Sequence, residues 1–275
     1  IYTHSGSGGG QISGSGSVTN TGTFARTGTG DQLISAVFNN RGTVANNSAS
    51  SVFFNNGGAD LNATYQPNAG LIGFGGGART VSGSSAVEAG AGAVNFNGAT
   101  VTFGPGTAYG NVDTTVSGGT VNFNTGNTVT LDRLTLTAGT LGGSDNIDVV
   151  NTLVFNGSTV RGTGVLTNLP GSPATLGAIN HTATLDDSRQ WVNQGSVDHQ
   201  GTNPFANLSL ANTSQFVNEG IYTHSGSDGG QISGSGSVTN TGTFTRTGTG
   251  DQLISAVFNN RGTVANNTAS SVFFN

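Results

Sequence analysis

The densest group of ionisable residues in this sequence lies between residues 181 and 199. It contains two consecutive carboxylates, Asp186 and Asp187, followed by Arg189 and flanked by His181 and His199. Paired carboxylates serve as the acid and the base of glycoside hydrolysis. The first hypothesis is therefore a carbohydrate-cleaving enzyme centred on the two aspartates.

The rest of the sequence argues against that enzyme. Pectin hydrolases, which use paired aspartates on a β-helix, add a Gly-His-Gly element and an Arg-x-Lys element. Neither element occurs here, and all eight basic residues are Arg. The segment 185–190 (LDDSRQ) is explained more simply by a polar turn ahead of the strand that contains Trp191. We expect no catalytic residues and no enzymatic activity.

Calcium is the next chemistry to consider, because some glycine-rich repeats bind it through GGxGxD nonapeptides. No such tandem occurs, although two short segments could donate carboxylate oxygens: Asp145 with Asp148, and Asp31 with its repeat equivalent Asp251. Solvated turns explain these aspartates more simply. Calcium is thus unsupported, and we expect no cofactor and no cofactor-binding residue.

Histidine and threonine patterns do not define a site either. His4 and His224 have no second ligand nearby in the sequence, which argues against zinc. Thr243 and Thr245 alternate as threonines do on ice-binding strands, but Ala25 stands at the place of Thr245 in the repeated copy. We expect no metal-ligating residue and no ice-binding face.

The dominant feature of the chain is a long segment whose sequence occurs twice. Residues 1–55 and 221–275 agree at all but three positions, so the sequence restarts after 220 residues. Fixed-period self-similarity is the mark of a repeat architecture. We predict a single β-solenoid rod over 1–275, in which 1–220 is one full long-period repeat and 221–275 starts the next. The three differences are Gly8/Asp228, Ala25/Thr245 and Ser48/Thr268.

The composition favours strands and turns over helices. Thr, Val, Phe, Asn, Ser and Gly abound, while Lys, Met and Cys are absent. Only 8% of the residues are charged, so Ser, Thr, Asn and backbone groups must cover most of the surface. A net charge of −5 without Lys leaves no basic stripe for nucleic acid. No stretch has the roughly 20 consecutive apolar residues of a membrane helix.

A shorter rhythm runs inside the long repeat: a hydrophobic strand, then Asn-x-Gly, then another strand. Its turn glycines Gly195, Gly220, Gly242 and Gly262 are 25, 22 and 20 residues apart. Gly and Asn accept left-handed backbone conformations, so each Asn-x-Gly is predicted to be a turn. Stacked turns would let asparagines share side-chain amide hydrogen bonds. The predicted ladder consists of Asn193, Asn218, Asn240 and Asn260.

The strands themselves alternate apolar and polar residues, as in 120–123 (TVNF), which gives each strand one buried face. The predicted inward aromatic residues are Phe38, Phe54, Phe96, Phe123, Phe155 and Phe216. Proline cannot donate to a strand ladder, so the proline segments 65–68 and 169–173 are predicted to be loops. The glycine run 73–77 is predicted to be a third loop.

These patterns predict an all-β chain that forms a right-handed parallel β-helix (β-solenoid), continuous along one axis. A closed sandwich or barrel has no reason to restart the same text, whereas a solenoid is open along its axis. At about 22 residues per coil, one long repeat makes about ten coils. An array of β-sandwiches, with antiparallel hairpins and two packed sheets, is the structural alternative.

The segments 238–244 (VTNTGTF) and 229–240 (GGQISGSGSVTN) resemble the glycine-rich β-helical repeats of large bacterial surface proteins. These include filamentous-haemagglutinin-like adhesins and autotransporter passenger domains. The resemblance covers most of the chain and implies an exported β-helix used for adhesion or as a structural stalk. The near-identical 220-residue tandem departs from that pattern, because passenger repeats are usually shorter and more degenerate. It adds weight to a long fibre.

We therefore expect a structural repeat protein, extracellular or at the cell surface, that forms a rod, fibre or adhesin stalk. Because the chain carries few charges, little electrostatic repulsion opposes lateral packing. The expected partner is therefore the protein itself, along the axis and side by side. Host or surface glycans are a second kind of partner, whereas no nucleic acid and no membrane insertion are expected. The alternative is a carbohydrate-binding or carbohydrate-cleaving β-helix, with an aromatic or acidic groove at one lateral position.

Overall fold

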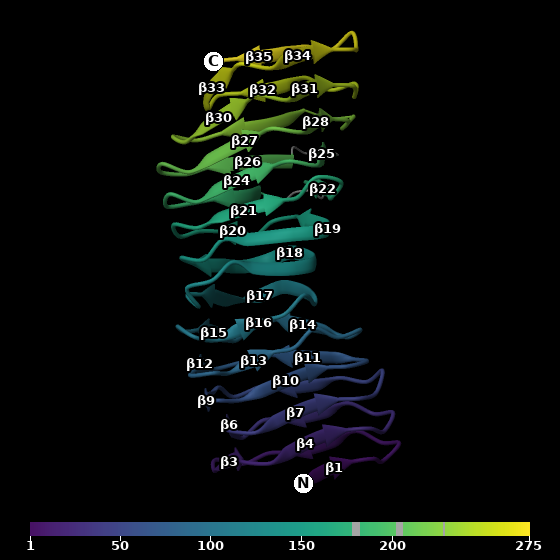
Figure 1. Cartoon of the computed structure of the whole chain (residues 1–275). Helices are drawn as coiled ribbons and strands as arrows, with labels where there is room; N and C mark the ends of the chain where they lie inside the picture. The colour runs from purple at the N-terminus through teal and green to yellow at the C-terminus, as the bar shows by residue number, and fades with distance from the viewer. Residues whose placement is uncertain (178–181, 202–205, 228) are drawn as a thin grey trace. The chain divides into compact units, whose positions relative to one another are not determined.

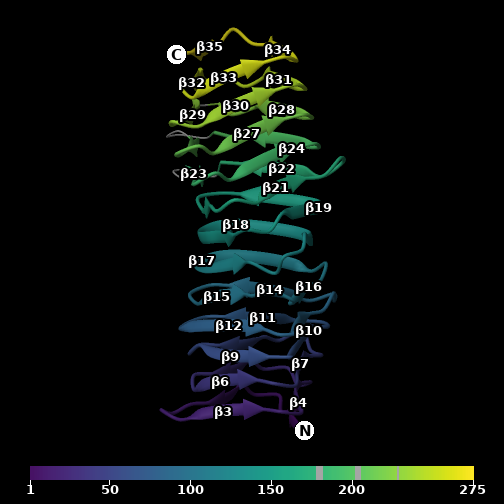
Figure 2. The same cartoon turned by 60° about the vertical axis from the view of Figure 1, so that its left-hand side comes forward.

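The computed structural model describes residues 1–177, 182–201, 206–227 and 229–275, and every regular element in these ranges is a β-strand. Parallel strands stack into a β-solenoid of about 13 turns (Figures 1 and 2). The predicted all-β solenoid of parallel strands is confirmed. The chain forms two compact units, Ile1–Asp132 (unit 1) and Arg133–Asn275 (unit 2). A single rod through both units stays a prediction.

In unit 1, each coil contributes one strand to each of three columns, and paired strands are parallel. The first column is β1 (Tyr2–His4), β4 (Thr23–Arg26), β7 (Thr43–Asn46), β10 (Thr64–Pro67), β13 (Ala86–Val87) and β16 (Ala108–Tyr109). The second is β2 (Gly10–Ile12), β5 (Gln32–Ile34), β8 (Val52–Phe54), β11 (Leu71–Phe74), β14 (Ala93–Phe96) and the start of β17 (Asp113–Phe123). The third is β3 (Ser17–Asn20), β6 (Val37–Asn40), β9 (Gly58–Leu61), β12 (Ala78–Ser82), β15 (Thr100–Phe103) and the end of β17.

Unit 2 has the same three columns, and β18 (Val129–Gly143) contains the boundary between the units. The first column is the end of β19 (Ile147–Phe155), β22 (Pro173–Leu176), β25 (Ser196–His199), β28 (Ile221–His224), β31 (Thr243–Arg246) and β34 (Thr263–Asn266). The second is the end of β18, β20 (Thr159–Val160), β23 (Thr182–Leu185), β26 (Ala206–Leu210), β29 (Gly230–Ser233), β32 (Gln252–Ile254) and β35 (Val272–Phe274). The third is the start of β19, β21 (Val165–Asn168), β24 (Gln190–Asn193), β27 (Gln215–Asn218), β30 (Ser237–Asn240) and β33 (Val257–Asn260).

The core consists of the inward residues of these strands, stacked from one coil to the next. Alternate residues are buried, as the period of two predicts. Aromatic rings continue the stacking: Phe74 and Phe96 lie 5.4 Å apart with 12° between their planes. All six predicted inward phenylalanines are at most 1% exposed, namely Phe38, Phe54, Phe96, Phe123, Phe155 and Phe216.

The two copies of the repeated text form the same eight strands, β1–β8 in unit 1 and β28–β35 in unit 2. They also share their pairing, since Tyr2 lies opposite Phe24 and Tyr222 opposite Phe244. One of the three substitutions leaves a bond intact, because the Ser48 hydroxyl lies 3.3 Å from Oδ1 of Asn46 and the Thr268 hydroxyl lies 3.3 Å from Oδ1 of Asn266. Asp228 lies outside the described residues.

Three local predictions are corrected. The four turn glycines do not have left-handed φ angles. They are required because successive coils touch there: a Cβ on Gly220 would lie 2.1 Å from the carbonyl oxygen of Gly195.

The predicted proline and glycine loops are partly strands. Pro67 ends β10 and Pro173 begins β22, at terminal positions where a missing N–H costs little. Gly73 lies within β11. Glycine leaves room there for the ring of Phe53, which lies 2.3 Å from where a Cβ would stand.

Candidate functional site

Among the described residues, the structure does not bring Asp186 and Asp187 together with His199. Asp186 and Asp187 lie in the turn between β23 and β24, where each accepts hydrogen bonds from a neighbouring coil. The Asn212 amide donates to Asp186 at 2.6 Å, and the Gly162 N–H donates to Asp187 at 3.1 Å. Arg189 is fully buried. His181 lies outside the described residues.

His199 belongs to a different column from the two aspartates and points into the core of unit 2. Its Nδ1 lies 2.6 Å from the Tyr222 hydroxyl and its Nε2 lies 3.2 Å from the Ala206 carbonyl oxygen. Burial lowers the pKa of His199 to about 4. The ring therefore stays neutral at neutral pH and acts as part of the packing.

His224 stacks one coil beyond His199, with ring centroids 5.0 Å apart. Its Nδ1 lies 2.9 Å from Nη1 of Arg246. Burial, followed by the influence of His199 and of Arg246, holds the pKa of His224 well below its usual value. A neutral imidazole can accept this hydrogen bond, so the row His199–His224–Arg246 is a buried structural network.

The acidic segments considered for calcium also have structural partners. Asp31 accepts the N–H of Ser51 at 2.8 Å, and its repeat equivalent Asp251 accepts the N–H of Ser271 at the same distance. Asp145 is buried and Asp148 is half-buried in β19. Within the described ranges, no group of three or more His, Asp and Glu could hold a metal ion.

An asparagine ladder joins the third-column strands of unit 2. Side-chain amides donate to the next side-chain oxygen from Asn193 to Asn218 at 2.6 Å, and onward to Asn240 and Asn260 at 2.7 Å each. The predicted ladder is confirmed. It begins one coil earlier than predicted, because Asn168 donates to Asn193 at 2.6 Å. The segment 165–168 (VLTN) could have predicted this, because it ends in asparagine as the other ladder strands do.

A buried charged cluster in unit 1 was not predicted. Nη1 of Arg79 lies 2.7 and 3.0 Å from the two carboxylate oxygens of Asp60, and the Tyr65 hydroxyl donates to Asp60 at 2.6 Å. The other Arg79 bonds reach the carbonyl oxygens of Phe38 at 3.0 Å and Gly57 at 2.7 Å. Burial raises the pKa of Tyr65, so its hydroxyl stays protonated and donates.

This cluster ends the asparagine ladder of the first copy. Asn20 donates to Asn40 at 2.8 Å, and the next position in the column is occupied by Asp60. The Asp60 carboxylate accepts the backbone N–H of Asn40 at 3.0 Å. A charged pair thus takes over the coil-to-coil contact from an amide pair.

The lateral surface carries mixed rows of side chains. On the second column of unit 1, Leu33, Phe53, Gly73, Asn95 and Thr115 are in register on successive coils. Phe53 is the one aromatic residue of this row. This row therefore does not repeat an aromatic or acidic side chain from coil to coil.

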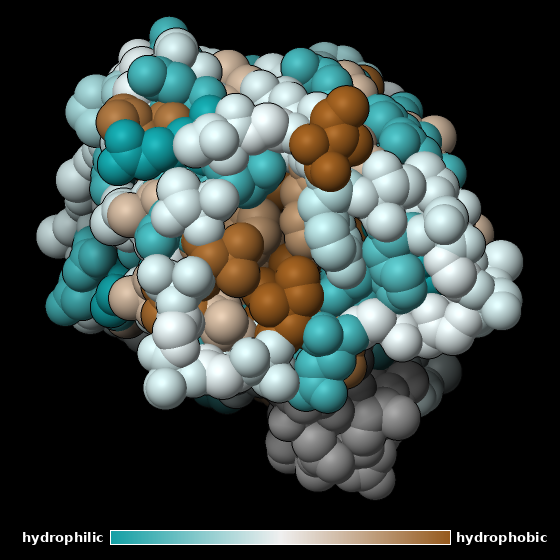
Figure 3. Space-filling model, turned by 90° about the horizontal axis from the view of Figure 1, so that it is seen from below, coloured by the Kyte–Doolittle hydropathy of each residue, from teal (hydrophilic) through white to brown (hydrophobic). Residues whose placement is uncertain are grey.

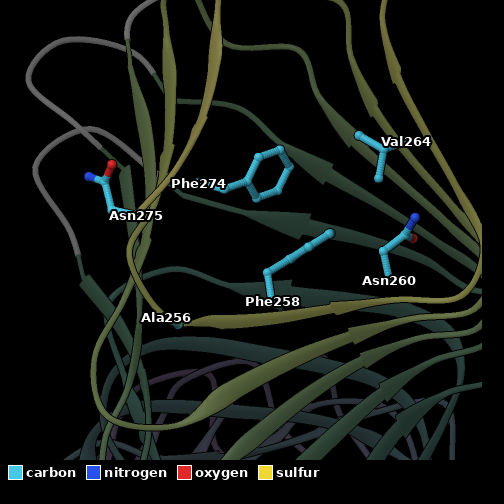
Figure 4. Close-up of a pocket in the computed structure, with 6 residues that line it drawn as sticks. All are labelled: Ala256, Phe258, Asn260, Val264, Phe274 and Asn275. Carbon is cyan, nitrogen blue, oxygen red and sulfur yellow. The ribbon is translucent and has the colours of Figure 1, made fainter.

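One opening in the described residues lies at the end of the last coil of unit 2. It encloses about 390 Å³ and is lined by Ala256, Phe258, Asn260, Val264, Phe274 and Asn275. In Figure 4, Phe258, Phe274 and Val264 point into one space, while Asn275 points away from it. We call the first five of these residues the open end.

The same residues are covered in the first copy. Phe274 is 48% exposed and Val264 is 37% exposed, whereas Phe54 is 1% exposed and Val44 is completely buried. The repeated text thus exists once with a coil on top of it and once without. The open end is therefore an apolar face of the last coil in the described chain.

The first coil of unit 1 also exposes apolar residues. Seen from below, hydrophobic surface lies in the middle of this face and hydrophilic residues surround it (Figure 3). Tyr2 is 45% exposed, whereas its repeat equivalent Tyr222 is buried above Val197 of β25.

Comparison with protein families, with curated proteins and with solved structures finds no match to this chain. The described ranges contain no helix long and apolar enough to cross a membrane. The candidate functional surfaces of this chain are therefore defined by the geometry of its coils alone.

Proposed function

We propose that this chain is a structural segment of an extracellular rod, fibre or adhesin stalk, without enzymatic activity and without a cofactor. One observation carries the proposal: the repeated text forms the same eight strands with the same register in both of its occurrences. A sequence that repeats its coil frame builds length without new information. Stacked backbone ladders along the coils resist extension.

The surface supports lateral association of such segments. The chain carries few charges, and its net charge is −5 over 275 residues. Little electrostatic repulsion therefore opposes side-by-side packing. The proposed partner is the protein itself, and glycans on a host or a neighbouring surface are proposed as the second kind of partner.

Electron microscopy of the 275-residue chain tests the rod. With about 13 coils and about 4.8 Å per coil, a single continuous rod would be roughly 60 Å long. Particles of uniform length and width support the proposal. Two globules with a variable angle between them would contradict it.

Incubation with polysaccharides tests the absence of enzymatic activity. We expect no new reducing ends with pectin, cellulose or host glycans. Turnover that disappears in Asp186→Asn or Asp187→Asn would overturn this part of the proposal.

A further inference from the structure

We propose that Asn97 and Gly98 form a self-modification site, at which the folded chain slowly converts the Asn97 side-chain amide into a carboxylate without an enzyme. The site lies inside unit 1, in the turn between β14 and β15. Strand β14 pairs with β11 on one side and with β17 on the other, so this turn has a coil on both sides. The proposal needs only this turn and is independent of the proposed function.

The reaction is an attack of the backbone on its own side chain. The Gly98 nitrogen, after losing its proton to solvent base, attacks Cγ of Asn97, and glycine has no side chain that hinders this approach. The new N–Cγ bond closes a cyclic imide, while the Cγ–Nδ2 bond breaks and ammonia leaves with a proton from water. Water then opens the imide at either carbonyl, which gives aspartate or isoaspartate. The balance is one water consumed and one ammonia released, without oxidation.

The chain has three Asn-Gly dipeptides, at residues 56–57, 97–98 and 156–157. Each lies in the turn that follows a strand, after β8, β14 and β19 respectively. Two of the three also share the preceding phenylalanine, as the segments 96–98 and 155–157 (FNG) show. Because their local sequences are so similar, the fold must decide which of them reacts.

At residues 97–98 the attacking nitrogen is free. The backbone N–H groups of Asn97 and Ala99 both donate to the Phe74 carbonyl oxygen, at 3.1 and 3.3 Å. Between them, the Gly98 N–H donates no hydrogen bond to any described residue, and no described residue binds the Asn97 side-chain amide. Asn97 and Gly98 are both exposed, so solvent base and water reach the two reacting groups.

The other two dipeptides are each restrained at one reacting group. Asn56 is exposed, but Gly57 is buried and its N–H donates to the Gly76 carbonyl oxygen at 2.9 Å. At Asn156 the side-chain oxygen Oδ1 is buried and has no hydrogen-bond partner among the described residues. The attack places negative charge on this oxygen, which is costly away from water. The fold therefore favours reaction at Asn97.

The two products have different effects on the coil. A Cβ on Gly98 would lie 2.2 Å from the carbonyl oxygen of Gly75, so this turn touches the neighbouring coil. Isoaspartate lengthens the main chain at this contact and would push the turn away from Gly75. Aspartate keeps the main chain and adds a negative charge to a chain in which only 8% of the residues are charged.

The test follows the reaction in water labelled with heavy oxygen, because each imide that this water opens retains a labelled oxygen. The folded 275-residue chain is kept at mildly alkaline pH, digested in acid, and analysed by mass spectrometry. Label at residue 97 should accumulate at least about fivefold faster than at residue 56, which is the effect of a typical backbone hydrogen bond. Label at residue 156 should also accumulate more slowly than at residue 97.

Two controls separate the fold from the local sequence. In denaturant, the three sites should react at similar rates, because each is then an unrestrained Asn-Gly dipeptide. The variant Asn97→Gln keeps an exposed amide but must close a larger ring, which forms more slowly. Its label at residue 97 should vanish, whereas labelling at residues 56 and 156 should stay as in the parent.

Equal labelling of residues 97 and 56 in the folded chain would overturn the proposal. A preference for residue 97 that persists in denaturant would overturn it as well, because the local sequence would then set the rate. Neither result changes what electron microscopy and polysaccharide incubation say about the proposed function.

Discussion

At the level of single residues, unit 1 contains a buried ion pair, since Asp60 and Arg79 are both almost fully buried. Buried charges cost free energy unless they are paired and hydrogen-bonded. Here the Arg79 guanidinium also lies over the rings of Phe54 and Phe74, at 5.0 and 5.6 Å. Both charges are thus matched by several partners, and neither can be removed alone without loss.

The variant Arg79→Met should destabilise unit 1, because it leaves the Asp60 carboxylate buried without a counter-ion. Breaking a buried pair in this way costs about 3–5 kcal/mol. Chemical denaturation measures the change in the free energy of unfolding. The double variant Asp60→Asn with Arg79→Met is the control and should recover much of the loss. Equal stability of the single variant and the parent would show that the pair contributes nothing.

His199 should make unit 2 sensitive to mild acid. Its pKa is about 4 in the fold because of burial, while an unfolded histidine has a pKa near 6.5. Below about pH 6.5 the unfolded state binds a proton that the folded state does not, so stability falls as the pH drops toward 4. Between pH 7 and pH 5 the loss amounts to about 2 kcal/mol.

Chemical denaturation of the parent and of His199→Gln at both pH values isolates this contribution. The variant should be less stable at pH 7, because it disturbs the bonds to Tyr222 and Ala206. Its loss between pH 7 and pH 5 should nevertheless be smaller. An unchanged pH dependence would mean that His199 is not the responsible group.

At the level of strands, the asparagine ladder fixes the register of the third column in unit 2. Each interior asparagine bonds both the next side chain and the backbone, as Asn218 does with Asn240 at 2.7 Å and with the Thr243 carbonyl oxygen at 2.9 Å. A slip by one residue would turn every inward side chain outward. The ladder therefore gives strand pairing a specificity that apolar stacking alone does not provide.

Replacing Asn218 by Ala should cost about 1–3 kcal/mol, because Asn193 and Asn240 lose their shared partner inside the core. Thermal or chemical unfolding measures the loss. The control is Gln215→Ala on the exposed side of the same strand, where the side-chain oxygen accepts a hydrogen bond from Gln190 at 3.1 Å. We expect the control to change stability by less than about 0.5 kcal/mol. Similar losses in both variants would argue against a special role of the ladder.

At the level of the whole chain, we expect the fold to need no metal ion. The chain has 13 acidic residues, and the candidates for calcium that can be followed, Asp31 and Asp251, bond backbone groups instead. Backbone pairing and stacked side chains join the successive coils, and these contacts do not require a metal ion.

Calcium should therefore leave thermal unfolding unchanged. A ligand that binds only the folded state raises the midpoint as its concentration exceeds its Kd. Millimolar calcium and excess chelator should give midpoints within about 1 °C of each other. A calcium-dependent rise of several degrees, absent with magnesium, would show a site that the aspartate geometry does not reveal.

The sequence by itself determined the coil frame. The alternation of apolar and polar residues placed Phe96 and Phe123 in the core, and the Asn-x-Gly rhythm placed Asn193, Asn218 and Asn240 in one ladder. These features are periodic along the chain, and stacking turns a repeated spacing into a spatial column. The reason for the glycines was not visible, since close approach to the next coil becomes apparent only when coils are stacked.

Tertiary structure alone decided the contacts that occur once. Asp60 and Arg79 are 19 residues apart and neither belongs to a repeated pattern, so their meeting depends on which coils lie next to each other. The same holds for His199 with Tyr222. Such contacts depend on which coils become neighbours, and the local sequence does not encode that.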